Sequence, residues 1–304
     1  MGTPDFAVAS LEAVAACPAI ELVQVISQPD RPAGRGRALR PAPVKARAEA
    51  LGLPVWTPEK LRGAEAVERL RALEAELFVV VAYGEILRPA VLALPHLGAL
   101  NVHASLLPRH RGAAPIAWAL LEGDRETGVT LMEMDAGMDT GPMIAERAIP
   151  IRPDHTLATL SDELAALGAG LLAELLPRWI GGELRATPQP HDAATYTRLI
   201  RKEDGRLDWT RPATALANQV RAFDPWPGTF TEWEGEPLKI SAARAEAGPA
   251  SAPPGTVERV GGAVRVATGD GWLALDRVQP PGKRPMTAQA FANGAKGFVG
   301  VRLG

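Results

Sequence analysis

Cysteine, tyrosine and long apolar runs are all scarce in this sequence. One cysteine and two tyrosines occur among 304 residues. The single Cys17 excludes an internal disulfide framework and fits a reducing compartment. No apolar run approaches the ~20 residues of a membrane-spanning helix, and no charged-then-apolar signal segment opens the chain. We therefore expect a cytoplasmic protein without a membrane anchor.

A large net charge is also lacking, since 33 basic and 35 acidic side chains leave a formal charge of −2. The overall balance is therefore no argument for a nucleic-acid partner. The distribution is more informative. Residues 31–47 include six basic residues and no acidic one, and residues 202–304 carry 13 basic and 11 acidic residues. This distribution permits contact with RNA without demanding it.

The length and the hydrophobic content of 46% favour two domains with real cores. In the first part, short β-rich runs alternate with segments of helical spacing. This alternation is typical of an open, mostly parallel, Rossmann-like α/β sheet, which binds ligands beyond the carboxyl ends of its strands. The predicted strands span residues 22–27, 77–82, 100–103 and 129–134, and the predicted helices span 6–16, 64–76 and 156–180.

The second part follows a connector rich in proline, threonine and short polar residues. A short helix at residues 212–222 comes next, and Gly261-Gly262 and Gly269-Asp270-Gly271 mark tight turns at hairpin spacing. We predict a first domain over residues 1–182, a linker over 183–201, and a small β-barrel domain over 202–304. Its predicted strands span residues 229–233, 238–242, 255–260, 263–268 and 272–279.

Three polar residues stand out because they combine an amide, an imidazole and a carboxylate, a set that suits acyl transfer to an amine. Asn101 and His103 are two apart in a predicted strand, so both side chains face one pocket. Asp139 lies in a loop after another strand, and we expect both segments to reach the same crevice. The alternatives without catalysis are that His103 is a structural histidine at a strand end and that Asp139 caps a turn. Asp135 is the nearest competitor of Asp139.

The motifs around these residues resemble those of the formyltransferases that use 10-formyltetrahydrofolate. The most specific ones are NVHASLLPRHRGAAPI at residues 101–116 and MDTGP at 138–142. The resemblance spans nearly the whole chain and implies a formyltransferase-type α/β sheet followed by an oligonucleotide-binding-like (OB-like) barrel. Further matching runs are GTPDFAV at 2–8, QPDRPAGRGRAL at 28–39, VVVAYGEIL at 79–87, RAFDPWPG at 221–228 and ATGDG at 267–271.

The resemblance implies an enzyme that moves the formyl group of 10-formyltetrahydrofolate to the α-amino group of methionine on initiator tRNA, a step of translation initiation. The implied catalytic residues are Asn101, His103 and Asp139, and no metal is required. We expect the protein to act as a monomer.

The resemblance also implies where the two substrates bind. The loop at residues 30–39 matches the one that enters the tRNA acceptor stem, with Arg35 at the position between two glycines and with Arg31 and Arg37 beside it. Lys283 and Arg284 are further candidates for phosphate contact. The implied pterin pocket comprises Tyr83, Ile86, Ser105, Leu106, Leu107 and Pro108.

Two other functions stay open. A formyltransferase for a small amine, such as glycinamide ribonucleotide or an amino sugar, would use the same catalytic residues. The separate C-terminal domain and the basic loop speak against it. A non-catalytic RNA-binding relative would not need Asn101, His103 and Asp139 together.

Four aromatic residues are predicted to belong to the hydrophobic core rather than to a base-stacking platform: Trp209, Phe223, Trp226 and Trp233.

The start of the chain departs from the family pattern. Members usually begin with a short apolar strand before the Gly-Thr-Pro turn, whereas Met1 here lies directly on that turn. A central strand of a parallel sheet is buried on both faces, so its loss would be costly. Our hypothesis is that the natural start lies several residues upstream.

Overall fold

The computed structural model describes residues 1–33 and 38–304, which fall into two compact units. No helix within these ranges is both long and apolar enough to cross a membrane. Unit 1 comprises Met1–Pro115, Glu126–Pro150 and Ser161–Thr197, and unit 2 comprises Ile116–Arg125, Ile151–Leu160 and Arg198–Gly304.

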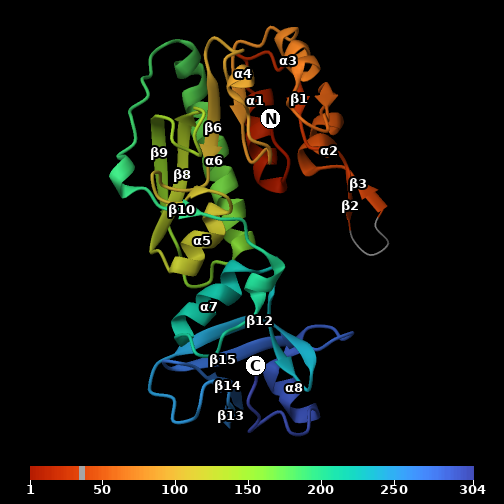
Figure 1. Cartoon of the computed structure of the whole chain (residues 1–304), viewed down its shortest axis with the longest axis vertical. Helices are drawn as coiled ribbons and strands as arrows, with labels where there is room; N and C mark the ends of the chain where they lie inside the picture. Colours follow the sequence, from red (N-terminus) through yellow and green to blue (C-terminus); the bar gives the residue numbers. More distant parts are fainter. Residues whose placement is uncertain (34–37) are drawn as a thin grey trace. The chain divides into compact units, whose positions relative to one another are not determined.

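Unit 1 is built on a four-stranded sheet in the order β5-β6-β8-β9 (Figure 1). The β5–β6 pair is parallel, whereas the β6–β8 and β8–β9 pairs are antiparallel. The α/β fold class is confirmed, with a sheet that is mixed. The strands are β5 (Phe78–Val80), β6 (Ala99–His103), β8 (Glu126–Glu133) and β9 (Met143–Pro150).

The reversal of β8 corrects one step of the sequence argument. Because β8 runs against β6, its carboxyl end lies beside Leu100, and His103 pairs with Thr130. The loop after β8 therefore starts at the opposite end of β6 from His103. An antiparallel β8–β9 pair was not expected, because the sequence analysis predicted no strand at β9. That edge strand carries Glu146 and Arg147, and its exposure alternates, so its apolar signal is weak.

The N-terminal residues join the sheet through a parallel bridge between Gly2 and Val81. The N–H of Gly2 donates to the carbonyl of Ile26 at 3.0 Å, and the N–H of Val81 donates to that of Met1 at 2.9 Å. This segment thus connects β5 to the parallel pair of β1 (Val25–Ile26) and β4 (Val55–Trp56). A mainly apolar cavity of about 380 Å³ lies beside it. The hypothesis of an upstream start stays a prediction.

A long helix covers one face of the sheet and fixes the direction of the β6 side chains. It is α6 (Leu157–Ile180), close to the predicted span of 156–180. A Cβ added at Gly168 would lie 2.7 Å from Cγ1 of Val102, so only glycine allows this approach. Val102 therefore faces α6, and its neighbours Asn101 and His103 face the other side of the sheet.

The other helices of unit 1 are short. The predicted helix over residues 64–76 ends at Arg71, and Glu74 then adopts a φ of +48°, which a right-handed helix does not allow. Two short strands, β2 (Arg31–Ala33) and β3 (Ala38–Arg40), pair antiparallel. The remaining helices are α1 (Val8–Ala15), α2 (Pro43–Ala50), α3 (Ala64–Arg71) and α4 (Pro89–Leu92).

Unit 2 is rich in antiparallel strands, which follow the order β11-β12-β15-β14-β13 with β16 paired to β15. All five predicted strands are present, and Gly261 and Gly262 link β13 to β14 with φ values of +56° and +90°, as a tight hairpin requires. Among the described residues no ladder joins β11 to β13. The strands are β11 (Thr229–Trp233), β12 (Glu236–Glu246), β13 (Val257–Val260), β14 (Ala263–Ala267), β15 (Trp272–Gln279) and β16 (Met286–Thr287).

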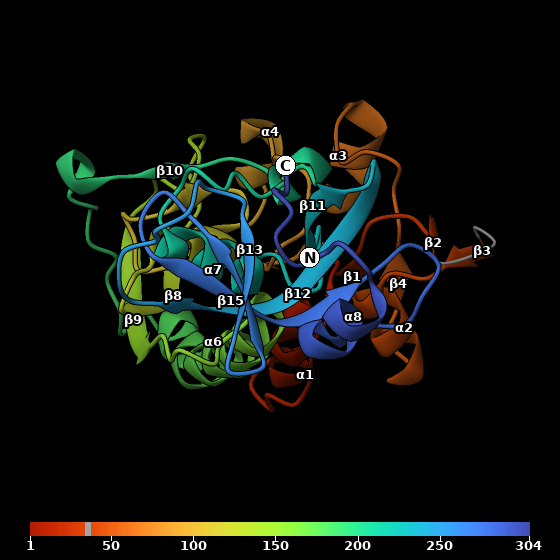
Figure 2. The same cartoon turned by 90° about the horizontal axis from the view of Figure 1, so that it is seen from below.

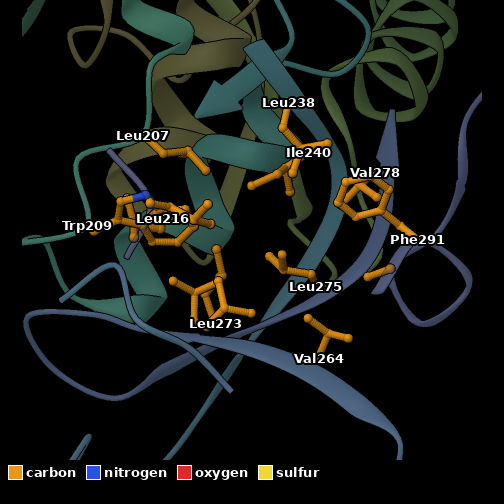
Figure 3. Packing of buried hydrophobic residues seen from close by; sticks show 14 of the residues in the cluster. Leu207, Trp209, Leu216, Leu238, Ile240, Val264, Leu273, Leu275, Val278 and Phe291 are labelled. Atoms are coloured by element: carbon orange, nitrogen blue, oxygen red, sulfur yellow. The ribbon is translucent and has the colours of Figure 1, made fainter. Parts of the chain in front are cut away.

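One apolar cluster holds unit 2 together (Figure 3). Leu216 of α7 (Ala213–Ala222) and Phe291 of α8 (Ala288–Gly294) pack on side chains of the sheet, and both helices lie along it in Figure 2. Trp209 and Phe223 are buried, and Trp233 makes edge-to-face contacts with Phe291. The core prediction is confirmed for these three aromatic residues. It is wrong for Trp226, which is 57% exposed.

Candidate active site

The polar face of β6 carries an amide and an imidazole side by side. Asn101 pairs with Val80 of β5 and with Met132 of β8, so its strand has a hydrogen-bonded neighbour on each side. Asn101 is 9% exposed and His103 is 6% exposed. Both polar groups are thus held in a largely dry environment, where a hydrogen bond to a developing charge is stronger than in water.

Asp139 lies against this face. Its Oδ1 is 3.7 Å from Nδ1 of His103 and accepts a long hydrogen bond of 3.5 Å from Nδ2 of Asn101. Its Oδ2 accepts a 2.8 Å bond from the N–H of Gly112. The expected convergence of amide, imidazole and carboxylate is thus present. It arises because the loop after β8 folds back over the sheet, and not because two parallel strands end at one edge.

The surroundings of His103 distinguish its two ring nitrogens. Its Nε2 lies 3.0 Å from the carbonyl oxygen of His110. A carbonyl only accepts, so Nε2 carries a hydrogen and donates it. Nδ1 is then the nitrogen without a backbone partner, and it faces Asp139. A proton on Nδ1 would form an ion pair with that carboxylate.

The competing carboxylate, Asp135, has a different task. Its Oδ1 accepts from the N–H of Gly137 at 3.0 Å and from Oγ1 of Thr140 at 2.7 Å. It is exposed and caps the turn of the loop that carries Asp139. Gly141 lets the loop return to the sheet, since an added Cβ there would lie 1.9 Å from the carbonyl oxygen of Glu133.

The segment after His103 forms a fixed wall near these groups. Oγ1 of Thr130 donates to the carbonyl of Ser105 at 2.7 Å and accepts from the N–H of Leu107 at 3.1 Å. Ser105 donates its hydroxyl to the carbonyl of Arg109 at 2.7 Å. A flat ligand would therefore meet a preformed loop at residues 105–108.

The two other residues predicted for the pterin pocket differ in environment. Tyr83 belongs to an apolar core cluster of unit 1 and is 2% exposed, and burial raises the pKa of its phenol. Ile86 is 81% exposed. Of these two residues, only Ile86 has a side chain that a ligand at the surface could contact. Tyr83 could contact a ligand only through its backbone groups.

The basic residues predicted to meet tRNA come from two regions of the chain. Arg35 and Arg37 fall outside the described residues. Arg31 is exposed, and its Nη2 donates to Oε1 of Gln28 at 3.2 Å. Lys283 and Arg284 are exposed in unit 2, between β15 and β16.

One buried pair near Asp139 was not selected from the sequence. Arg111 is 1% exposed and Gln189 is 3% exposed, and they are hydrogen-bonded to each other. Gln189 lies in the segment predicted to be a linker. Its neighbours Tyr196 and Thr197 form β10 (Tyr196–Thr197), which pairs with β7 (Arg111–Gly112). A glutamine between two prolines carries no sequence signal for burial.

Family comparisons cover both units. Residues 1–181 match the family described as formyl transferase, and residues 199–296 match the formyl transferase C-terminal domain. Two bacterial relatives, both called methionyl-tRNA formyltransferase, are similar over nearly the whole chain. The one from Roseiflexus sp. is 50% identical over all of this chain and 94% of its own length. The one from Halorhodospira halophila is 51% identical over 97% of this chain and 95% of its own length.

A solved structure supports the fold. The N-formyltransferase of Helicobacter canadensis, solved in complex with folinic acid and dTDP-3-aminofucose, superposes with a TM-score of 0.66. The two chains are 19% identical, and the superposition covers 92% of this chain and 97% of the other. At that identity the likeness concerns the fold alone.

Proposed function

The chain belongs to the formyl transferase family, and we propose on this premise that it transfers a formyl group to the α-amino group of methionyl-tRNA. The methionyl-tRNA acceptor follows from relatives that share about half of the residues of this chain over nearly its full length. The observation that carries the chemistry is the meeting of Asn101, His103 and Asp139 on the polar face of β6. The donor is folate-derived, and we propose 10-formyltetrahydrofolate.

The residues at this site fit such a donor. Asn101 presents an amide and His103 an imidazole, and the loop at residues 105–108 follows directly. That loop is already hydrogen-bonded to Thr130, so binding need not order it. Preformed walls with a few placed polar groups are typical of small-molecule sites.

We assign the oxyanion to Asn101 and His103. The amine attacks the formyl carbon, a new C–N bond forms, and negative charge develops on the formyl oxygen. The amide of Asn101 donates a hydrogen bond to that oxygen, and so does the Nδ1–H of protonated His103, whose one hydrogen is shared between the oxygen and the Asp139 carboxylate. Each good donor in such a place contributes roughly 3–4 kcal/mol to the stability of the transition state.

Asp139 orients the imidazole and manages the proton. Its carboxylate faces Nδ1 of His103, and its contact with the N–H of Gly112 holds it there. Directly or through water, it carries the proton lost by the amine towards the folate nitrogen that leaves. In this mechanism hydrogen bonds alone activate the formamide-like donor, and no metal takes part.

Two basic regions are proposed to hold the tRNA. Arg31, Arg35 and Arg37 would reach the acceptor stem, and Lys283 and Arg284 would contact backbone phosphates. The proposed organisation is a catalytic domain over residues 1–182, a connector over 183–201, and a tRNA-binding domain over 202–304. A cytoplasmic monomer acting on initiator tRNA completes the proposal.

The test is a direct assay. Purified protein, 10-formyltetrahydrofolate and methionine-charged initiator tRNA are mixed, and formylmethionine is measured after mild deacylation. We expect formylation of the initiator tRNA and none of methionine-charged elongator tRNA. Formylation of glycinamide ribonucleotide or an amino sugar instead would favour the small-amine alternative.

A further inference from the structure

The loop that carries Asp139 adopts a backbone shape that needs support. Asp139 has a φ of +53°, a left-handed conformation that is unfavourable for residues other than glycine. Its side chain makes one short bond, to the N–H of Gly112, and two long contacts with Asn101 and His103. These contacts hold the Asp139 side chain only weakly, and the cap from Asp135 acts on the neighbouring Gly137 and Thr140.

Gln189 supplies the support from the other side. Its Nε2 donates to the carbonyl of Asp139 at 2.9 Å and to that of Gly141 at 2.7 Å. The two carbonyls belong to the residues before and after Thr140, so one amide group holds the backbone on both sides of Thr140. Gln189 is 3% exposed, and breaking these bonds would leave buried polar groups unpaired.

Arg111 sets the orientation of that amide. Its Nε and Nη2 both donate to Oε1 of Gln189, at 3.0 and 2.6 Å. A flipped amide would place its NH₂ group against two N–H donors and its oxygen against two carbonyls, so only the observed orientation is satisfied. The rest of the guanidinium donates to Oη of Tyr196 at 3.1 Å and to Nδ1 of His191 at 3.0 Å.

We propose that Gln189 is a positioning residue, which holds the Asp139 carboxylate opposite Nδ1 of His103 and is itself oriented by Arg111. The separation of 3.7 Å between Asp139 and His103 lies at the limit of a useful contact. Misplacement of a catalytic group by about 1 Å costs about 100-fold in rate. This inference rests on the proposed function, because its main readout is formyl transfer.

Two substitutions separate the bonds of Gln189. Gln189→Leu keeps much of the volume and removes every bond. Gln189→Glu keeps an acceptor for Arg111 and removes the two donors to the loop. We expect both variants to lower kcat for formyl transfer by about 10- to 100-fold, with KM for the folate changed by less than about twofold. A kcat within twofold of wild type in either folded variant would overturn the proposal.

A double-mutant cycle tests whether Gln189 acts through Asp139. In an Asp139→Asn background, adding Gln189→Leu should lower kcat by less than about threefold, because the group that Gln189 positions is already disabled. If Gln189→Leu lowers kcat by the same factor in both backgrounds, Gln189 does not act through Asp139.

Unit 2 offers a matched control. Gln219 is also 3% exposed, donates through Nε2 to the carbonyls of Asp204 and Arg206, and accepts from Arg211. Gln219→Leu should lower the thermal midpoint about as much as Gln189→Leu while leaving kcat within about twofold. If both variants lose the same factor in kcat, Gln189 acts only by stabilising the fold, and the proposal is rejected.

Hydrogen exchange gives a readout that does not depend on turnover. Amide exchange of residues 137–141 should be faster in Gln189→Leu than in wild type and unchanged in Gln219→Leu. If wild type transfers no formyl group to methionyl-tRNA, the proposed function fails and exchange still decides this inference. Unchanged exchange in Gln189→Leu would overturn it.

Discussion

The carboxylate of Asp139 lies 3.7 Å from Nδ1 of His103, on the side of the ring away from the bond that Nε2 makes to a backbone carbonyl. The ring is therefore anchored at one nitrogen and free to exchange a proton at the other. In the proposed mechanism Nδ1 is therefore the nitrogen that acts, and the predictions on catalysis follow from this assignment.

Replacing His103 should greatly slow formyl transfer and leave folate binding almost unchanged. His103→Ala removes a proposed oxyanion donor, so we expect kcat to fall by about 100- to 1,000-fold. Folate affinity, measured by equilibrium titration, should stay within about threefold of wild type. Near-normal turnover would reject the assignment of His103.

Asp139→Asn tests charge at nearly constant shape. The asparagine still offers an oxygen to the N–H of Gly112 but cannot form an ion pair with a protonated Nδ1. We expect kcat to fall by about 100-fold or more with folate binding retained, as measured by single-turnover formylation. Asp135→Asn is the control. It weakens the turn cap that Asp135 forms with Gly137 and Thr140 and should lower turnover by less than about tenfold.

Arg35→Ala should weaken tRNA use far more than folate use. A phosphate contact contributes electrostatic affinity that falls as salt rises. KM for methionyl-tRNA should therefore rise by about tenfold, and the slope of log affinity against log salt should decrease by about one. Equal losses for both substrates would contradict the proposed role.

Acid stability should depend on Asp204. Its carboxylate accepts two hydrogen bonds from Arg198, at 2.7 and 2.8 Å, and one from the N–H of Arg201. The bonds from Arg198 lower the pKa of Asp204 to about 2 from 3.8, against the effect of partial burial. A depressed carboxyl pKa means that the stabilisation is complete above the unfolded value and is lost as pH falls through the folded one.

The corresponding measurement is the free energy of unfolding against pH. Asp204→Asn should lower it by about 1 kcal/mol at pH 7, a small value because Arg198 is 55% exposed and solvent screens the pair. The difference from wild type should shrink between pH 4 and pH 2. A difference that is constant with pH would reject the ion-pair explanation. Glu203→Gln, next to the pair and exposed, should have little effect.

The sequence by itself determined the local structure and the identity of the candidate groups. Period and turn residues predicted all five strands of unit 2 and the long helix of unit 1, because these signals act over a few neighbouring residues. The spacing of Asn101 and His103 placed both on one face of a strand, since the side-chain period of a strand is two.

Only the tertiary structure decided how the site closes. The antiparallel direction of β8 depends on pairing between distant segments, and no local pattern encodes it. The sequence analysis preferred Asp139 over Asp135 because of the family resemblance. The structure supplies the physical reason, since the loop folds back over β6 and brings Asp139 to His103 while Asp135 caps the turn. The burial of Gln189 beneath that loop depends on a partner 78 residues away, Arg111. Such long-range packing lies beyond what periodicity and spacing report.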